Sequence, residues 1–456
     1  MSTPPVPPGF DDEVLASEAW FRAQLRTLVE LPSVSPGATQ DRDIRASAIA
    51  ARELLSSMGA QAELVETRGT PTVIGRLRHP NARARVIVYN HLDVQPADAA
   101  VWQQANPFHF EVEDHPKRQF LYGGRGATDD KGPALCALRG AKIAIDHGAP
   151  IDVTFVWETE EEIGSPHFGE VLTARREELA AAEAVIVSDT IWPTDQQPAV
   201  STGLRGSLHA NLRLRTAGKE VHSGLAGGVA RNPVRELCAL ATAIDGAGFW
   251  HAGVTAPSED EIAGFLASGF DPEYFLHAHD LHHVTTRVPL EMMLKIWTRP
   301  TFEVHGLAGG YTGRGTKTIV PEAAELKVSF RLVPDQDPMV IGQALVEFVR
   351  AVNPDVVVDL GGWLAPYRAD QGGKVHRAIV EALHATTGRC PVTVREGGSI
   401  GAVPMIAREL GRPVHVLPLS LPDHGYHAPN EFFDWRQARV GIGAFARAFT
   451  AIASNP

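Results

Sequence analysis

The sequence predicts an α/β domain, with a mostly parallel sheet flanked by helices, into which an α+β domain is inserted. Short β-branched runs alternate with helical patterns through the first 200 residues, as they do where helices connect parallel strands. Near Gly206 the pattern changes to strands of alternating polar and apolar residues, and after about residue 367 the first pattern returns. We therefore predict a discontinuous first domain, residues 1–205 and 367–456, and an inserted domain, residues 206–366.

The first part of the discontinuous domain contains one clear early helix and a series of buried strands. The helix covers Ile44–Met58 and ends at Gly59, a residue suited to a helix C-terminus. Apolar and β-branched runs predict four strands and a further helix, namely Thr72–Ile74, Val86–Tyr89, Val153–Trp157 and Val185–Val187, with the helix at Ala134–Ile145.

The inserted domain and the last part of the chain differ in pattern. In the inserted domain we predict a loop-rich stretch over residues 246–323, strands at Ser207–Arg215, Leu326–Val333 and Val356–Leu360, and helices at Pro233–Ile244 and Val340–Val352. In the last part we predict one strand at Val414–Leu419 and helices at Val375–Thr386, Ala402–Leu410 and Gln437–Ala453.

The composition excludes several classes of partner. The chain carries 42 Lys and Arg against 54 Asp and Glu, a formal net charge of −12, so nucleic acid and anionic membranes are not expected partners. No apolar run approaches the roughly 20 residues needed to span a bilayer. Residues 1–8 lack the segments of a signal peptide, and the three cysteines are far apart and odd in number. We expect a cytoplasmic protein with free cysteines that are buried as small apolar residues.

The most informative run, Tyr89 to Pro96, follows an apolar strand. His91 lies where this strand ends, at the sheet edge where α/β enzymes place their chemistry. Asp93 lies two residues later, and its carboxylate is placed to accept the second ring N–H of His91, as carboxylates do beside metal-bound imidazoles. Taken alone, this pattern also fits a structural or surface histidine.

Two acidic runs follow. The run Gly124–Gly132 contains Asp129 and Asp130 between glycines, and it reads either as a tight loop that aims a carboxylate inward or as a helix N-cap. The run Glu158–Ser165 has four glutamates in five positions directly after an apolar strand. A solvated acidic face is the ordinary interpretation of such a run, but at a sheet edge crowded carboxylates require cations or protons to neutralise them.

Two later segments add further donors. Asp189 ends the apolar run at Val185–Val187, and His427 lies in a loop after the strand at Val414–Leu419. Strands from across the domain thus each end in a histidine or a carboxylate. Two histidines and several carboxylates, without cysteine, suit a pair of divalent ions, with zinc as the first choice and manganese or cobalt as alternatives.

These five ordered motifs resemble those of the co-catalytic zinc peptidases, the family of cytosolic non-specific dipeptidase, carnosinase, succinyl-diaminopimelate desuccinylase and acetylornithine deacetylase. The resemblance is closest to the dipeptidase and carnosinase branch and covers roughly residues 20 to 450. It implies a zinc-peptidase catalytic domain with an inserted domain that serves as lid and dimerisation domain. It also implies five metal ligands: His91 and Asp189 for one ion, Glu162 and His427 for the other, and Asp129 as the bridge.

The resemblance also implies the catalytic groups. Glu161 would be the general base, and Asp93 would orient His91. A non-proline cis peptide is expected after Asp129. In the inserted domain, Glu220–Gly224 with Asn232-Pro233 resembles the lid signature, in which His222 reaches the partner subunit's site and stabilises the tetrahedral oxyanion.

Three further residues match substrate-binding positions of the family. They are Thr318 in Lys317–Pro321, Arg331 in Arg331–Pro334, which would hold a C-terminal carboxylate bidentately, and Ser399 in Glu396–Ile400. The chain departs from the usual pattern at Asn90, Leu92, Gly401 and within Trp363–Gly373, which lacks the substrate-binding histidine of carnosinase-like enzymes. These departures leave the implied ligands intact but put the identity of the substrate in doubt.

The resemblance implies a di-zinc hydrolase that cleaves the peptide bond of dipeptides and works as a homodimer. An N-acyl-amino-acid deacylase with the same metal site is the alternative, against which Asp189 argues, since the deacylase branches tend to carry Glu there. A catalytically inactive binding protein is a remote third reading, and the complete ligand set with Glu161 argues against it.

Overall fold

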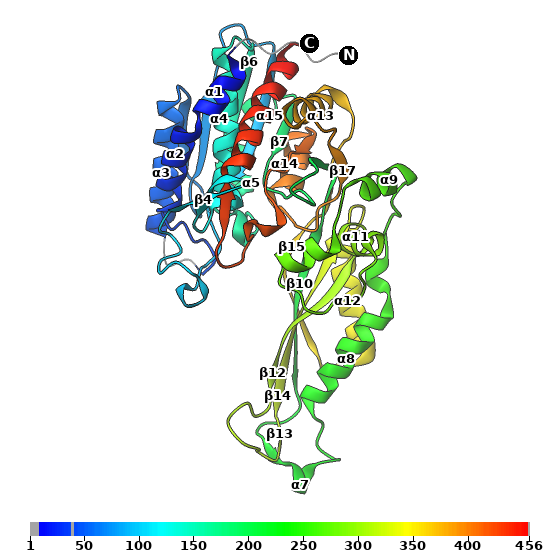
Figure 1. The fold of residues 1–456 in the computed structure, drawn as a ribbon. Coiled ribbons are helices and arrows are strands. Elements are labelled where there is room, and N and C mark those ends of the chain that lie inside the picture. Colours follow the sequence, from blue (N-terminus) through cyan, green and yellow to red (C-terminus); the bar gives the residue numbers. More distant parts are fainter. Residues whose placement is uncertain (1–8, 38–40, 455–456) are drawn as a thin grey trace.

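The computed structural model describes residues 9–37 and 41–454, and these fold into two parts (Figure 1). One part is built around an eight-stranded sheet and the other around a four-stranded sheet. Residues 1–8, in which no signal peptide was expected, lie outside the described residues. Within the described ranges, no helix is long and apolar enough to cross a membrane.

The eight-stranded sheet has a parallel centre. Its strand order is β1-β2-β6-β3-β7-β18-β8-β17, and the four strands β6, β3, β7 and β18 run parallel to one another. Strands β2 and β8 join this centre in antiparallel orientation, so the sheet is mixed at its margins. In sequence order the strands are β1 Gln61–Val65, β2 Thr72–Leu77, β3 Ala84–His91, β6 Ile151–Glu158, β7 Ala184–Val187, β8 Ala199–Ser201, β17 Val392–Val394 and β18 Val414–Val416.

Helices cover both faces of this sheet, as predicted. Along β3, Val86 and Val88 point into one core cluster, while Ile87 and Tyr89 point into the other. The first cluster is shared with α1 Phe10–Ala16, α2 Glu18–Val29, α3 Asp41–Ser57, α4 Gly132–Asp146, α13 Gly373–Thr387 and α15 Trp435–Ser454. The second is shared with α5 Phe168–Ala174, α6 Arg176–Leu179 and α14 Ala402–Leu410. Burial on both faces explains why these strands read as near-continuous apolar runs.

The four-stranded sheet is antiparallel and covered on one face. Its order is β12-β14-β10-β15, and the strands are β10 Gly206–Arg215, β12 Thr301–Gly309, β14 Ala323–Leu332 and β15 Val357–Leu364. Leu208 and Leu212 of β10 pack against α8 (Pro233–Ala247) and α12 (Pro338–Val352), whereas His209 and Arg213 are exposed. The predicted alternation in this strand is therefore confirmed.

The far end of this second part carries a short ribbon. Strand β11 (Val221–His222) pairs with β13 (Ile319–Val320), and helix α7 (Ser223–Ala226) follows β11. In Figure 1 these elements lie at the end of the second part that is most distant from the eight-stranded sheet.

The chain leaves and re-enters the first part at neighbouring positions. Strand β9 (Gly203–Leu204) pairs with β16 (Tyr367–Arg368), so the two connections lie side by side. The remaining small sheet joins β4 (Glu111–His115), β5 (Gln119–Gly123) and β19 (Phe432–Asp434). The predicted domain limits at 206 and 366 fall close to the β9–β16 pair and stay a prediction.

The predicted loop-rich stretch, residues 246–323, is wrong. It contains α9 (Glu259–Ala267), α10 (Pro272–Ala278), α11 (Pro289–Trp297) and strand β12. Phe265 of α9 and Trp297 of α11 join the main core cluster of the first part. These helices have 7 to 9 residues each, too short to display a clear repeat, and their apolar residues serve a core built from distant segments.

The cysteines are free, as predicted, but only one is buried. Cys136 lies in α4 within the core, whereas Cys238 and Cys390 are exposed. The prediction that all three cysteines are buried, made from their apolar sequence neighbours, is wrong for these two. Cys238 lies on the outer side of α8, and Cys390 lies in the segment after α13.

Candidate metal and substrate site

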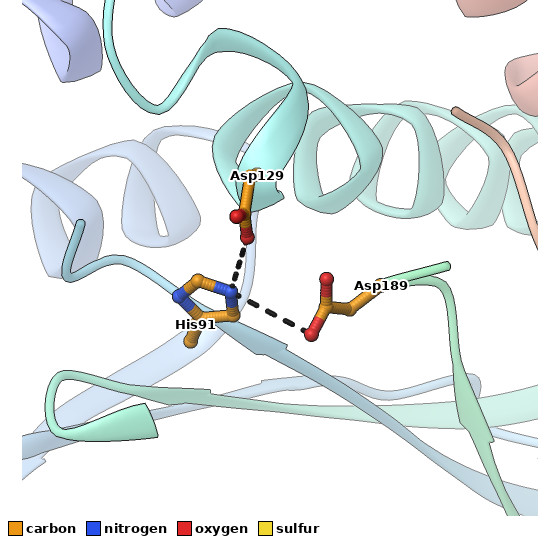
Figure 2. Close-up of side chains that lie close together, drawn as sticks. All are labelled: His91, Asp129 and Asp189. Carbon is orange, nitrogen blue, oxygen red and sulfur yellow. Dashed lines mark hydrogen bonds and ion pairs between the residues drawn. The ribbon is translucent and has the colours of Figure 1, made fainter. Parts of the chain in front are cut away.

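His91, the last residue of β3, presents one ring nitrogen to two carboxylates. Its Nδ1–H donates to the backbone carbonyl of Asp93 at 2.9 Å, and Asp93 Oδ1 lies 3.5 Å from the same nitrogen. The other nitrogen, Nε2, lies 2.9 Å from Asp129 Oδ1 and 3.6 Å from Asp189 Oδ2 (Figure 2). The nearer partner of Nδ1 is thus the carbonyl and not the carboxylate that the sequence pointed to.

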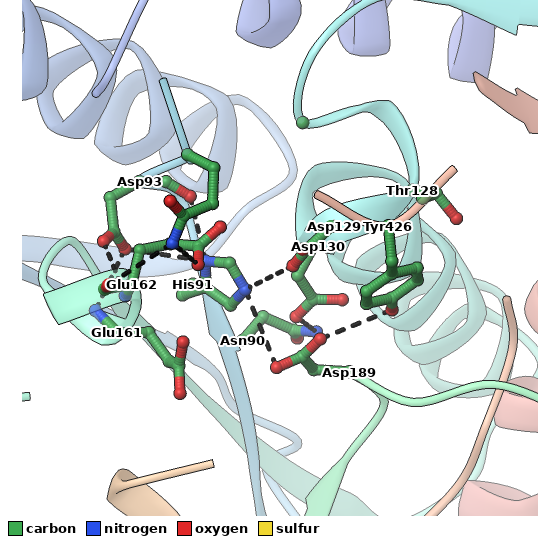
Figure 3. A network of polar contacts seen from close by, with 12 residues as sticks. Asn90, His91, Asp93, Thr128, Asp129, Asp130, Glu161, Glu162, Asp189 and Tyr426 are labelled. Carbon is green, nitrogen blue, oxygen red and sulfur yellow. Dashed lines mark hydrogen bonds and ion pairs between the residues drawn. The ribbon is translucent and has the colours of Figure 1, made fainter. Parts of the chain in front are cut away.

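The carboxylate of Asp93 instead holds the turn after β6. It accepts the Ser35 hydroxyl at 2.5 Å and the backbone N–H groups of Glu161 at 3.2 Å and Glu162 at 3.0 Å. Asp93 therefore connects the His91 loop to the two glutamates that the sequence singled out. This contact fixes where the backbone of Glu161 lies relative to His91 (Figure 3).

Asp129 lies in the loop that precedes α4, and its peptide bond to Asp130 is cis, as expected. The carboxylate of Glu431 anchors this loop by accepting the backbone N–H groups of Gly126, Thr128 and Asp129 at 2.9 to 3.1 Å. Arg125 Nη1 donates to the same carboxylate at 2.8 Å. Glu431 lies four residues after His427, so one buried side chain links the two loops.

A second histidine group shares Asp129. Nε2 of His427 lies 3.1 Å from Asp129 Oδ2 and 3.1 Å from Glu162 Oε2. Gln95 Nε2 donates to the same Glu162 oxygen at 2.7 Å. Two groups of possible metal ligands thus meet at one carboxylate: His91, Asp129 and Asp189 form the first, and Asp129, Glu162 and His427 form the second.

The ionisation of these groups reflects burial and mutual contact. Burial opposes ionisation of Asp129, but hydrogen bonds from His427 and His91 outweigh it and lower the pKa of its carboxyl group. Burial raises the pKa of Asp189, of Glu162, and of Glu161, the last to about 8. Burial lowers the pKa of His427, but contacts with Asp129 and Glu162 raise it to about 11.

Burial thus disfavours the ionised carboxylates of this cluster, while contact with Asp129 and Glu162 favours the protonated imidazole of His427. A divalent cation would neutralise the same carboxylates and leave the imidazoles free to act as ligands. The donor atoms are all nitrogen and oxygen, and they converge in two groups around one shared carboxylate. The residues therefore fit two divalent ions of the zinc, manganese or cobalt type.

A cavity of about 320 Å³ opens onto this cluster. Its lining includes Asp129, Glu161, Asp189 and His427 of the cluster, and also Arg331 and Ser399. Arg331 Nη1 donates to Ser399 Oγ at 3.1 Å, so the structure brings these two predicted substrate residues together. Arg331 leaves most of its donors available for an anionic group.

Two predicted site residues, His222 and Thr318, do not line the cavity. His222 belongs to β11, and Thr318 Oγ1 is 3.5 Å from its Nε2. Both side chains are exposed on the ribbon at the far end of the second part (Figure 1). Within one chain, the structure does not bring His222 or Thr318 to the cavity.

Several residues near the site carry no sequence prediction. Tyr426 donates its hydroxyl to Asp189 at 3.4 Å (Figure 3). Glu396 lines the cavity. Tyr426 directly precedes His427, so its position in the motif was a usable signal. Gln95 and Asn90 lie in the first run but are neutral amides, which no charge pattern singles out.

The fold and the two histidine–carboxylate groups are those of a metallopeptidase. Residues 87–451 match peptidase family M20/M25/M40, and because this is most of the chain, the protein belongs to that family.

Individual relatives agree with this assignment. The chain is 26% identical over 398 residues to beta-Ala-His dipeptidase of Homo sapiens, covering 84% of this chain and 78% of that protein. It is 29% identical over 407 residues to Cys-Gly metallodipeptidase dug1 of Schizosaccharomyces pombe, covering 84% and 83%. The solved structure of the dipeptidase Dug1p of Saccharomyces cerevisiae has the same fold, with a TM-score of 0.85 at 24% identity over 98% of each chain.

Proposed function

We propose that this protein is a two-metal hydrolase that cleaves the peptide bond of dipeptides. The observation that carries the proposal is Glu161, which stands in one cavity with two histidine–carboxylate groups that share Asp129. Arg331 and Ser399 bound the same cavity, where a C-terminal carboxylate can bind. The substrate class is supported by the relatives, which are named as dipeptidases acting on beta-Ala-His and Cys-Gly.

His91, Asp129 and Asp189 hold one ion in this proposal, and Asp129, Glu162 and His427 hold the other. Zinc is the first choice, with manganese and cobalt as alternatives. Divalent ions held by these residues would supply an activated water and would polarise the scissile carbonyl. Asp93 contributes by orienting His91 and by holding the backbone of Glu161 and Glu162.

Glu161 moves the proton. It takes a proton from the attacking water and passes it to the amine that leaves, which makes it first a general base and then a general acid. Burial raises the pKa of the Glu161 carboxyl group above its ordinary value. Arg331 and Ser399 fix the substrate's carboxylate, so that the scissile bond lies between Glu161 and the histidine–carboxylate groups.

The active unit is a homodimer formed through the inserted domain. His222 and Thr318 are exposed and remote from the cavity of their own chain, so a partner is needed for them to act. His222 of the partner subunit stabilises the oxyanion of the tetrahedral intermediate. The three free cysteines support a cytoplasmic location.

A substrate panel tests the class of substrate. Metal-loaded protein is expected to hydrolyse dipeptides with a free C-terminus faster than N-acyl amino acids, measured as release of free amino acid. Faster release from acyl amino acids would make the protein a deacylase with the same metal groups. If neither kind of substrate is cleaved by protein that holds both ions, the hydrolase proposal fails and a binding protein remains.

Removal of metal is expected to abolish activity. A chelator should inactivate the protein by removing the ions. Adding zinc, manganese or cobalt should restore turnover, because the side chains that bind each ion remain in the protein after the ion is removed. Activity that persists after complete removal of metal, measured by elemental analysis, would contradict a two-metal mechanism.

His91→Ala and His427→Ala separate the two ions. Each variant is expected to bind less metal than the wild type, because each histidine serves one ion only. Elemental analysis after dialysis measures the ions retained. A full complement in both variants would remove these histidines from the ligand set.

A further inference from the structure

A buried hydrogen-bond network lies directly behind the first histidine–carboxylate group. Asn90 Nδ2 donates to Asp130 Oδ2 at 2.7 Å and to Ser188 Oγ at 2.8 Å. All three side chains have an exposed fraction of 0%. Asn90, Asp130 and Ser188 are each the chain neighbour of one member of the first group, which consists of His91, Asp129 and Asp189.

One nitrogen atom makes both connections. Among the described residues, Asn90 Oδ1 and Asp130 Oδ1 have no hydrogen-bond partner, so the network depends on the two N–H bonds of the Asn90 amide. Such an amide has two donors, and both are used. Loss of this side chain therefore removes both of these hydrogen bonds at once, and leaves the contacts of His91 with Asp129 and Asp189 as links between the segments.

The backbone does not provide the same link. Strand β3 pairs with β7 from Val86↔Ala184 to Tyr89↔Val187, and the ladder ends there. Asn90 and Ser188 are the next residues along these two strands, and only their side chains continue the connection. The Asn90 bond to Asp130 adds the loop of Asp129, which belongs to neither strand.

The network acts against repulsion between carboxylates. The possible ligand atoms of Asp129 and Asp189 lie within 4.8 Å of each other, and two ionised carboxylates at such a distance repel one another. Bonds that hold the neighbouring residues keep the three donor atoms converged. A cation then meets ligands that require no rearrangement, which increases its affinity.

The second group has a separate support. Gln95 Nε2 donates to Glu162 Oε2 at 2.7 Å, and among the described residues Gln95 makes no hydrogen bond to Asn90, Asp130 or Ser188. The amide of Asn90 therefore supports the first histidine–carboxylate group, and the amide of Gln95 supports the second. Only Asp129 belongs to both groups. This arrangement provides a matched pair of variants.

We propose that Asn90 is a positioning residue that sets the affinity of the His91, Asp129 and Asp189 group for its divalent ion, without setting that of the other group. The inference rests on the two-metal site proposed above. It gives a role to one of the positions at which this chain departs from the usual pattern of the resembling family.

The test measures cobalt binding to metal-free protein by visible absorption and by equilibrium dialysis. In a His427→Ala background only the first group is complete, and Asn90→Ala is expected to weaken cobalt binding there by about 10–100-fold. In a His91→Ala background only the second group is complete, and Asn90→Ala is expected to leave cobalt affinity unchanged. Gln95→Ala serves as the matched control and should give the opposite pattern.

Each outcome decides a different point. Wild-type protein that binds no cobalt overturns the two-metal proposal itself. Wild-type protein that binds two ions, with Asn90→Ala unchanged in the His427→Ala background, overturns only the role of Asn90. An equal loss of affinity in both backgrounds shows a general structural effect and also overturns it.

A milder variant covers the case in which Asn90→Ala does not fold. Ser188→Ala removes one of the two acceptors and leaves the Asn90–Asp130 bond in place. It is expected to weaken cobalt binding in the same direction, by a smaller factor, and only in the His427→Ala background. Unchanged affinity there contradicts the proposal.

Discussion

Glu161→Gln is expected to lower turnover by about 10²–10⁴-fold while both metal ions stay bound. Glutamine has nearly the same size as glutamate, but its amide cannot accept and return a proton. Glu161 belongs to neither histidine–carboxylate group, so the change removes a base without removing a ligand. Steady-state turnover and elemental analysis of the same sample measure the two effects.

The neighbouring Glu160 provides a matched control. Its carboxylate accepts the backbone N–H of Thr70 at 3.0 Å, lies 2.9 Å from His167 Nδ1, and does not line the cavity. Glu160→Gln makes the same chemical change one residue away and should leave most of the turnover. Glu161 is not the base if its glutamine variant keeps more than about a tenth of wild-type turnover, since general bases contribute more than this.

Mixing two inactive variants is expected to restore activity if His222 acts in the partner's site. One variant is His222→Ala and the other Glu161→Gln. In a mixed dimer, the site with an intact Glu161 receives an intact His222 from the other subunit, while the second site lacks both. Random exchange makes half of the dimers mixed, each with one of its two sites complete, so about a quarter of wild-type activity is expected.

The controls for this experiment separate exchange from function. Each variant alone is incubated under the same conditions, and subunit exchange is followed with a fluorescent label on one variant. His222→Ala alone should lower turnover with its metal content intact, because it serves the transition state and not the ions. Demonstrated exchange without recovery of activity would mean that His222 works within its own chain or has no catalytic role.

The eight-stranded sheet could be predicted from the sequence because its residues are buried on both sides. Val86–Tyr89 and Val185–Val187 are apolar runs that no amphipathic helix would show, and both form strands of the parallel centre. Parallel strands bring their carboxyl ends to one edge, so His91 and Asp189, two residues after Val187, were expected to be close. The structure places His91 Nε2 3.6 Å from Asp189 Oδ2.

The segment from 246 to 323 could not be predicted in the same way. Helices α9 and α11 lie within the inserted sequence but place Phe265 and Trp297 in the core of the first part. Start signals were present, such as the Ser258–Glu261 capping box before α9. The apolar residues of these helices pack against a surface formed by segments far away in the chain, so the local sequence does not show that they are buried.

The fold class and the residue types at the strand ends could be predicted from local pattern alone, and with them the residues that we propose as ligands of divalent ions. Local pattern suffices for this, since strand burial and chain direction place such residues at one edge. The three-dimensional packing shows which donors share Asp129, that Asp93 holds the backbone of both glutamates, and that Asn90 bonds to Asp130 and Ser188. The contacts of Asp93 and Asn90 join residues 40 to 98 positions apart, and their distances depend on packing that no local pattern records.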